Sequence, residues 1–151
     1  MPMERIELIE EKIRAWLGQM GLPVTTGPGG IITLKSDRSL LFISLASGDR
    51  RPWVRITAIA LVGFTPSLDF LHRVLELNNE VAFGGFRLFE DRTLAFSTTL
   101  QPDALDADGF ADATRYVAYV ADTWAPELRA LAGGRYSVEL TRDLDEGRGT
   151  T

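Results

Sequence analysis

The chain has 151 residues, 45% of them hydrophobic and 25% charged, a composition typical of one globular domain. It has no cysteine, which excludes disulfides, thiolate zinc sites and cysteine nucleophiles and fits a cytoplasmic location. The 16 basic and 21 acidic residues give a net charge of −5, which repels a phosphate backbone, so we expect no nucleic-acid partner. No apolar run reaches the roughly 18 residues that a membrane-spanning helix needs, and the charged N-terminal segment does not match a signal peptide, so we expect no membrane association.

The N-terminal segment predicts an amphipathic helix from Met3 to Met20, because its apolar residues recur at steps of three and four positions. Gly21 and Pro23 then end the helix. Three strand-like runs follow at residues 31–35, 40–46 and 53–62, separated by loops rich in turn formers. Such short connections predict antiparallel neighbours, since parallel strands need a longer crossover.

The third of these runs alternates between two faces. One face holds small and branched apolar residues and is expected in the core: Val54, Ile56, Ala58, Ala60 and Val62. The other face holds Trp53, Arg55 and Thr57 and is expected to be partly open.

The second half of the chain predicts helix, hairpin and helix. Thr65 and Pro66 suit the N-cap and first position of a helix that runs to about Asn79. Strands at about residues 83–89 and 93–100 follow, joined by a short turn. The last helix has the strongest apolar periodicity, and we expect it to pack on the sheet together with the first helix, burying Trp16 and Trp124.

These elements predict an α+β domain over residues 1–141, with an antiparallel five-stranded sheet packed with helices in the order α-β-β-β-α-β-β-α. Within it, residues 136–141 are expected to form a short strand or an extended arm. Residues 142–151 are expected to form a flexible polar tail.

Three features from residue 68 to residue 134 together resemble the YbjN-like family: the Asn78-Asn79 pair, the FGGFRLFEDRTLAFSTTL hairpin, and the AD…W-APEL…GG run. The fold of that family is that of bacterial type III secretion chaperones. The resemblance implies a non-enzymatic module that binds a protein or an extended peptide client, as a chaperone or regulatory adaptor. It also implies a homodimer, often formed through the second helix and the neighbouring strand.

Two surfaces are candidate interfaces. For the client we expect Trp53, Arg55 and Thr57, with Trp53 supplying buried area and arginine pairing with client carboxylates or carbonyls. Arg50 and Arg51 extend this cationic patch, for which solvated loop charges are the alternative interpretation. For the homodimer, the second helix presents more apolar surface than one sheet contact needs, and we expect these residues in the interface: Phe70, Leu71, Val74 and Leu75.

Residues that could carry catalysis or bind a metal are few. His72 is the only histidine, so a histidine-pair or thiolate metal site is excluded. The aspartates before the last helix do not match a calcium loop, because Leu105 and Ala107 stand where oxygen ligands belong. Helix capping by Asp106 or Asp108 accounts for them. We therefore expect no enzyme activity, no catalytic residue, no metal and no cofactor.

Two glycine motifs remain. Residues 27–30 predict a turn, because they precede a strand and lack the lysine-serine continuation of a phosphate loop. Gly84-Gly85 predicts a bulge or close packing of the second helix, with approach of a ligand as the alternative. The second class of function is accordingly a small-ligand sensor, in which aromatic residues of the last two strands line a pocket between sheet and helix.

Overall fold

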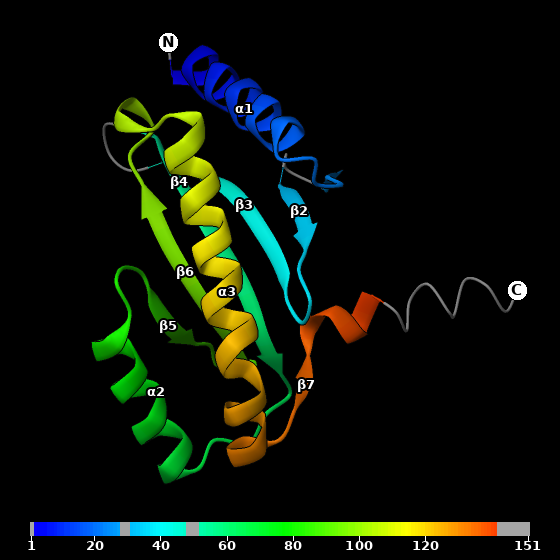
Figure 1. Ribbon diagram of the computed structural model, residues 1–151, viewed down its shortest axis with the longest axis vertical. Coiled ribbons are helices and arrows are strands. Elements are labelled where there is room, and N and C mark those ends of the chain that lie inside the picture. Colours follow the sequence, from blue (N-terminus) through cyan, green and yellow to red (C-terminus); the bar gives the residue numbers. More distant parts are fainter. Residues whose placement is uncertain (1, 28–30, 48–51, 142–151) are drawn as a thin grey trace, which may run out of the picture.

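An antiparallel sheet with its helices gathered on one side makes up the part of the chain that the computed structural model describes, residues 2–27, 31–47 and 52–141 (Figure 1). The sheet order is β1-β2-β3-β4-β6-β5, and β7 pairs with β4. In chain order the elements are α1 (Pro2–Gln19), β1 (Thr25–Thr26), β2 (Ile32–Lys35), β3 (Leu40–Ser47), β4 (Pro52–Val62), α2 (Leu68–Glu80), β5 (Gly85–Leu88), β6 (Thr93–Leu100), the 3₁₀ turn η2 (Pro102–Ala104), α3 (Ala107–Ala132) and β7 (Arg135–Tyr136).

The predicted fold class and all five predicted strands are confirmed. The two additional strands, β1 and β7, have two residues each, too few for an alternating pattern to show in the sequence. The expectation for residues 136–141 was wrong in part, because only Tyr136 joins a strand and residues 137–141 are helical. The predicted tail, residues 142–151, lies outside the described residues.

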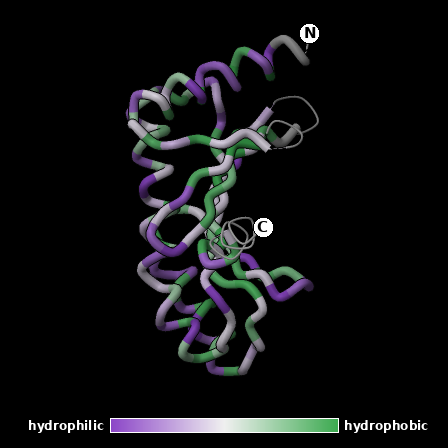
Figure 2. The backbone as a smooth tube through the Cα atoms, turned by 90° about the vertical axis from the view of Figure 1, so that its right-hand side faces the viewer, coloured by the Kyte–Doolittle hydropathy of each residue, from purple (hydrophilic) through white to green (hydrophobic). Residues whose placement is uncertain are grey.

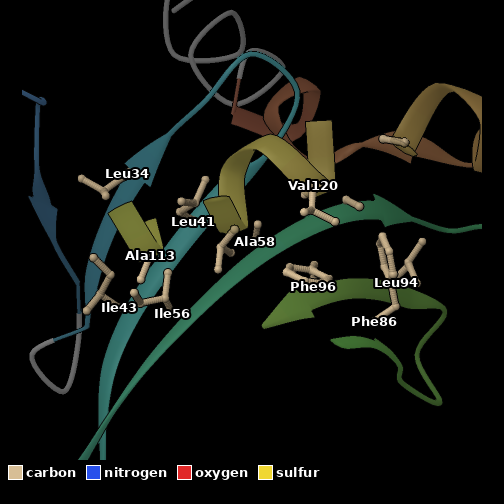
Figure 3. Close-up of a cluster of buried hydrophobic side chains, with 14 of the residues drawn as sticks. Leu34, Leu41, Ile43, Ile56, Ala58, Phe86, Leu94, Phe96, Ala113 and Val120 are labelled. Atoms are coloured by element: carbon tan, nitrogen blue, oxygen red, sulfur yellow. The ribbon is translucent and has the colours of Figure 1, made fainter. Parts of the chain in front are cut away.

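The core lies between the sheet and α3, which runs along β4 and β6 (Figure 1). Figure 3 shows Ala113 and Val120 of α3 facing strand residues such as Ile56 and Phe96. Figure 2, turned by 90°, shows the helices gathered on one side of the strands. Contrary to the two-helix expectation, α2 also covers this face, because it contacts both α3 and β5. Within the described residues, no helix is both long and apolar enough to cross a membrane.

A bulge in β4 changes which residues face the core. Val54, Ile56 and Ala58 are fully buried, as predicted from the alternation. Between Ile59 and Leu61 the register with β6 shifts by one residue. Leu61 is therefore buried and Val62 is only half-buried, which corrects the placement of Val62 in the core.

The helix ends follow side-chain capping. Asp106 accepts a hydrogen bond from Gly109 N at 2.7 Å, which confirms the capping interpretation. For α2 the N-cap is Ser67 and not Thr65, and the Ser67 hydroxyl accepts from Phe70 N at 3.2 Å. The chain is held outside the helix at Thr65, whose N–H donates to Ala132 O at 2.8 Å.

The two helical tryptophans are half-buried, which corrects the expectation of largely buried side chains. Trp16 contacts Phe110 with ring centroids 5.5 Å apart, at the crossing of α1 and α3. The guanidinium of Arg73 lies over the ring of Trp124, at 5.2 Å from the ring centroid. Each ring therefore packs on its inner side and keeps an outer side near solvent, a position that suits the large, amphipathic indole.

Candidate functional site

No helix of the described structure covers the side of the sheet away from α1, α2 and α3, and we call this side the open face. Register and alternation place on it the residues Thr33, Lys35, Leu40, Phe42, Ser44, Trp53, Arg55, Thr57, Ile59, Gly85, Arg87, Ala95, Ser97 and Thr99. Of these, Ala95 and Ser97 are buried by their neighbours. None of its apolar side chains packs against the buried core cluster. The open face is thus a second surface, separate from the core that stabilises the fold.

The three residues predicted to bind the client lie together on the open face, in successive outward positions of β4. Trp53 is 38% exposed, whereas Arg55 and Thr57 are half-buried. The guanidinium of Arg55 donates one long hydrogen bond, 3.4 Å, to the hydroxyl of Thr99 on β6. Trp53 is therefore accessible to a partner, with a cation beside it on the same strand. Arg50 and Arg51 lie outside the described residues.

The predicted dimer residues of α2 divide into two sets. Phe70 and Val74 are buried in the core of their own chain, so their assignment to an interface was wrong. Both project from the side of α2 that meets α3 and β5. Leu71 and Leu75 are 36% and 66% exposed and lie on the other side. With Leu68, which is 72% exposed, they form an apolar stripe that we call the α2 surface.

Asn78 completes the outer edge of β5. Its amide oxygen accepts from Phe86 N at 2.7 Å, and its amide nitrogen donates to Phe86 O at 3.3 Å. The side chain thus makes the pair of bonds that a neighbouring strand would make, on an edge that no described strand pairs. The helix itself continues to Glu80 and is capped at Val81, one residue beyond the predicted end at about Asn79.

The backbone at Gly84 shows why a glycine is needed in the Gly84-Gly85 pair. Its φ is +77°, and a Cβ there would lie 2.7 Å from Ser97 O of β6. The close contact of Gly84 is with β6, whereas a Cβ at Gly85 would lie 3.8 Å from Asn78 Oδ1 of α2. The aromatic residues beside Gly84 pack against each other. The ring centroids of Phe86 and Phe96 are 5.0 Å apart, and both residues are buried. Three grooves of the described structure are lined by other side chains.

A groove of about 340 Å³ runs between α1 and the strands β2 and β3. Its lining is mainly aliphatic, from Ile6, Glu10, Ile13, Ile31, Ile32, Ile43, Ser44 and Leu45. It opens beside the sheet edge where only the two-residue β1 covers β2. The sequence pattern did not predict this groove, because it forms between elements that are separate in the chain.

Catalytic geometry is not apparent in the described residues. His72 is exposed on α2, in a shallow depression that is also lined by Leu68, Asp69, Arg73, Glu76 and Leu131. No group of three or more His, Asp or Glu side chains in the described ranges could hold a metal ion. The hydrogen bond that Arg73 Nε donates to Glu127 at 2.7 Å raises the pKa of the arginine. This bond ties α2 to α3 and so has a structural role.

Comparisons with known proteins agree with this geometry. The family model described as "T3SS (YopN, CesT) and YbjN peptide-binding chaperone 1" matches residues 6–140. A comparison with curated protein sequences found no match.

Solved structures of similar fold include secretion chaperones and YbjN. The ExsC–ExsE complex has a TM-score of 0.66 and 14% identity, over 82% of this chain and 95% of that chain. The Yersinia pestis type III secretion chaperone SycH, in complex with a stable fragment of YscM2, has a TM-score of 0.56 and 15% identity, over 76% of this chain and 98% of that chain. YbjN from E. coli has a TM-score of 0.60 and 13% identity, over 78% of this chain and 92% of that chain. At these identities the likeness is one of fold, whereas the family model spans most of the sequence, and the chain therefore belongs to the family of type III secretion (YopN, CesT) and YbjN peptide-binding chaperones.

Proposed function

We propose that this member of a peptide-binding chaperone family holds an extended segment of a client protein on its open face, with Trp53 as the main anchor and Arg55 and Thr57 as polar contacts. The observation that carries the proposal is the exposure of Trp53 on a sheet face whose apolar side chains lie outside the main core cluster. An aromatic side chain on a rigid strand loses little conformational entropy on binding and buries a large area, so it is an effective anchor.

The family and the solved complexes support a binding role. The family description names peptide binding, and ExsC and SycH were each solved with a protein partner. A client segment could also pair with the strand edge beside β1, where the groove between α1 and β2 would take its apolar side chains. We further propose that the protein acts without catalysis and in the cytoplasm.

We also propose a homodimer formed through the α2 surface and the neighbouring β5. Leu88 and Phe89 at the end of β5 are 42% and 41% exposed, and β5 contacts α2. Together with the α2 surface they would form an apolar patch at one end of the molecule, of the kind that self-complementary interfaces cover. The patch is distinct from the open-face anchor, which lies on β4.

Selection from a displayed library of random peptides tests the client face. We expect the protein to enrich a set of peptides that Trp53→Ala binds at least about tenfold more weakly, as for loss of an interface anchor. Tyr119→Ala is the matched control, because Tyr119 is also an exposed aromatic, 63% accessible, but lies on α3. Its enriched peptides should be those of the parent.

Two results would contradict the proposed face. One is the enrichment of identical peptides by the parent and by Trp53→Ala. The other is a set of peptides whose binding depends on Tyr119 or on the groove beside α1. Thermal unfolding of each variant serves to show that the fold is retained, since exposed positions change stability by only about 0.5 kcal/mol.

A further inference from the structure

A single row of outward side chains crosses the open face from one side of the sheet to the other. The strand register joins its members in the order Arg87, Ala95, Ile59, Leu40 and Lys35. The three central residues are apolar: Ala95 is buried, and Ile59 and Leu40 are half-buried. Each end carries an exposed cation. The row is therefore an apolar track with a positive charge at both ends.

The charge of the sheet is opposite to that of the chain. The net charge is −5, yet the five main strands, β2 to β6, contain no aspartate or glutamate. Within the described residues, no carboxylate lies within ion-pair distance of Lys35, Arg55 or Arg87. Some arginines elsewhere are paired, since Arg5 contacts Asp103 at 2.7 Å and Arg73 contacts Glu127 at 2.7 Å. No carboxylate of the described residues therefore neutralises these three cations, although the guanidinium of Arg87 lies over the ring of Phe89, 5.3 Å from its centroid.

The length of the row defines the partner that would fit it. Four strand-to-strand steps separate Arg87 from Lys35, and at about 4.8 Å a step they span about 19 Å. An extended peptide rises about 3.3 Å per residue, so about six residues cover this distance. Carboxylates at such a spacing would meet both cations at once.

We propose that the row binds an extended client segment that has an apolar centre and an aspartate or glutamate at each end, about six residues apart. This proposal rests on the proposed function, since it names the chemistry of the client that the open face holds. Arg55 and Trp53 lie beside the row on β4 and would contact residues next to the apolar centre. Charge complementarity selects an acidic peptide over a neutral or a basic one.

Fluorescence anisotropy with designed peptides tests the spacing and the charge. The probe is a fluorescein-labelled peptide of alternating threonine and valine, with one aspartate near each end about six residues apart. Comparison peptides carry asparagine at both ends, lysine at both ends, or two adjacent aspartates at one end. We expect the probe to bind most tightly and its affinity to fall as salt is raised.

Charge-reversing variants locate the binding to the row. Lys35→Glu and Arg87→Glu should each weaken binding of the probe about threefold to tenfold, through one lost exposed ion pair and one added repulsion. The double variant should prefer the lysine-ended peptide to the probe. Lys12→Glu is the matched control, because Lys12 is an exposed lysine of α1 on the helical side of the sheet. It should bind the probe as the parent does.

The outcomes separate this proposal from the proposed function. Equal binding of the aspartate-ended and asparagine-ended peptides, with both weakened by Trp53→Ala, would overturn the acidic preference and support the open face. If none of the designed peptides binds, the proposed binding of an acidic segment to the row is wrong. The selection from the displayed library would then still test whether the open face binds a client. If a second copy of the chain covers the row, Arg87→Glu would change the mass seen by light scattering and leave peptide binding unaltered, which would also overturn the proposal.

Discussion

Asn78 shows how one side chain protects the edge of a sheet. It occupies both backbone groups of Phe86 on the outer side of β5, so a partner strand cannot pair at that residue without displacing it. Strand addition at this edge is thereby disfavoured.

The energetic role of Asn78 is measurable. Asn78→Ala should lower the free energy of unfolding by about 1 to 3 kcal/mol, because a buried backbone donor and acceptor lose their partners. Asn79→Ala is the matched control, since Asn79 is exposed on the next position of the same helix and should change stability by less than about 0.5 kcal/mol. Urea denaturation of both variants gives the comparison. Equal effects of the two substitutions would mean that the bridge to Phe86 contributes nothing.

At the scale of elements, Asp122 fastens α3 to the turn between β2 and β3. One carboxylate oxygen accepts hydrogen bonds from Ser36 Oγ at 3.1 Å, Arg38 N at 3.0 Å and Ser39 Oγ at 2.9 Å. The C-terminal segment holds the same turn from another side, because Val138 N donates to Arg38 O at 3.2 Å. The end of the row at Lys35 is therefore held by contacts from α3 and from residues 137–141.

Removing the Asp122 carboxylate should loosen this turn. We expect Asp122→Ala to destabilise the protein by about 1 to 3 kcal/mol, as for a charged acceptor with several donors. Asp112→Ala serves as the control, since Asp112 is an exposed aspartate of the same helix and should change stability by less than about 0.5 kcal/mol. Hydrogen exchange should show faster exchange of the Arg38 amide in the first variant only. Unchanged exchange there would show that the turn holds without Asp122.

At the scale of the whole molecule, the proposed homodimer depends on the α2 surface. Leu75→Glu should shift the protein from dimer to monomer, because a carboxylate would be buried unpaired in an apolar interface. Leu8→Glu introduces the same charge at a leucine of α1 that is 59% exposed, compared with 66% for Leu75, and should leave the mass unchanged. Light scattering at concentrations on the order of tens of micromolar measures this difference. A monomeric parent protein would exclude the dimer at such concentrations.

Much of this molecule follows from the order of its residues. Local patterns determine the helices and the five main strands, because the periods of 3.6 and 2 arise from backbone geometry within each element. The alternation in β4 was enough to place Trp53, Arg55 and Thr57 on one side of the sheet. Composition alone excluded disulfides, thiolate metal sites and histidine pairs.

Tertiary structure decided what depends on pairing between distant segments. The sequence shows that α2 is apolar, but only its packing on α3 and β5 buries Phe70 and leaves Leu75 exposed. The bridge from Asn78 to Phe86 and the bulge after Ile59 likewise depend on non-local register. The row from Arg87 to Lys35 joins five strands whose order in the sheet differs from their order in the chain. Alternation assigns a side chain to a face, whereas its neighbours on that face are set by long-range strand pairing, which no local pattern encodes.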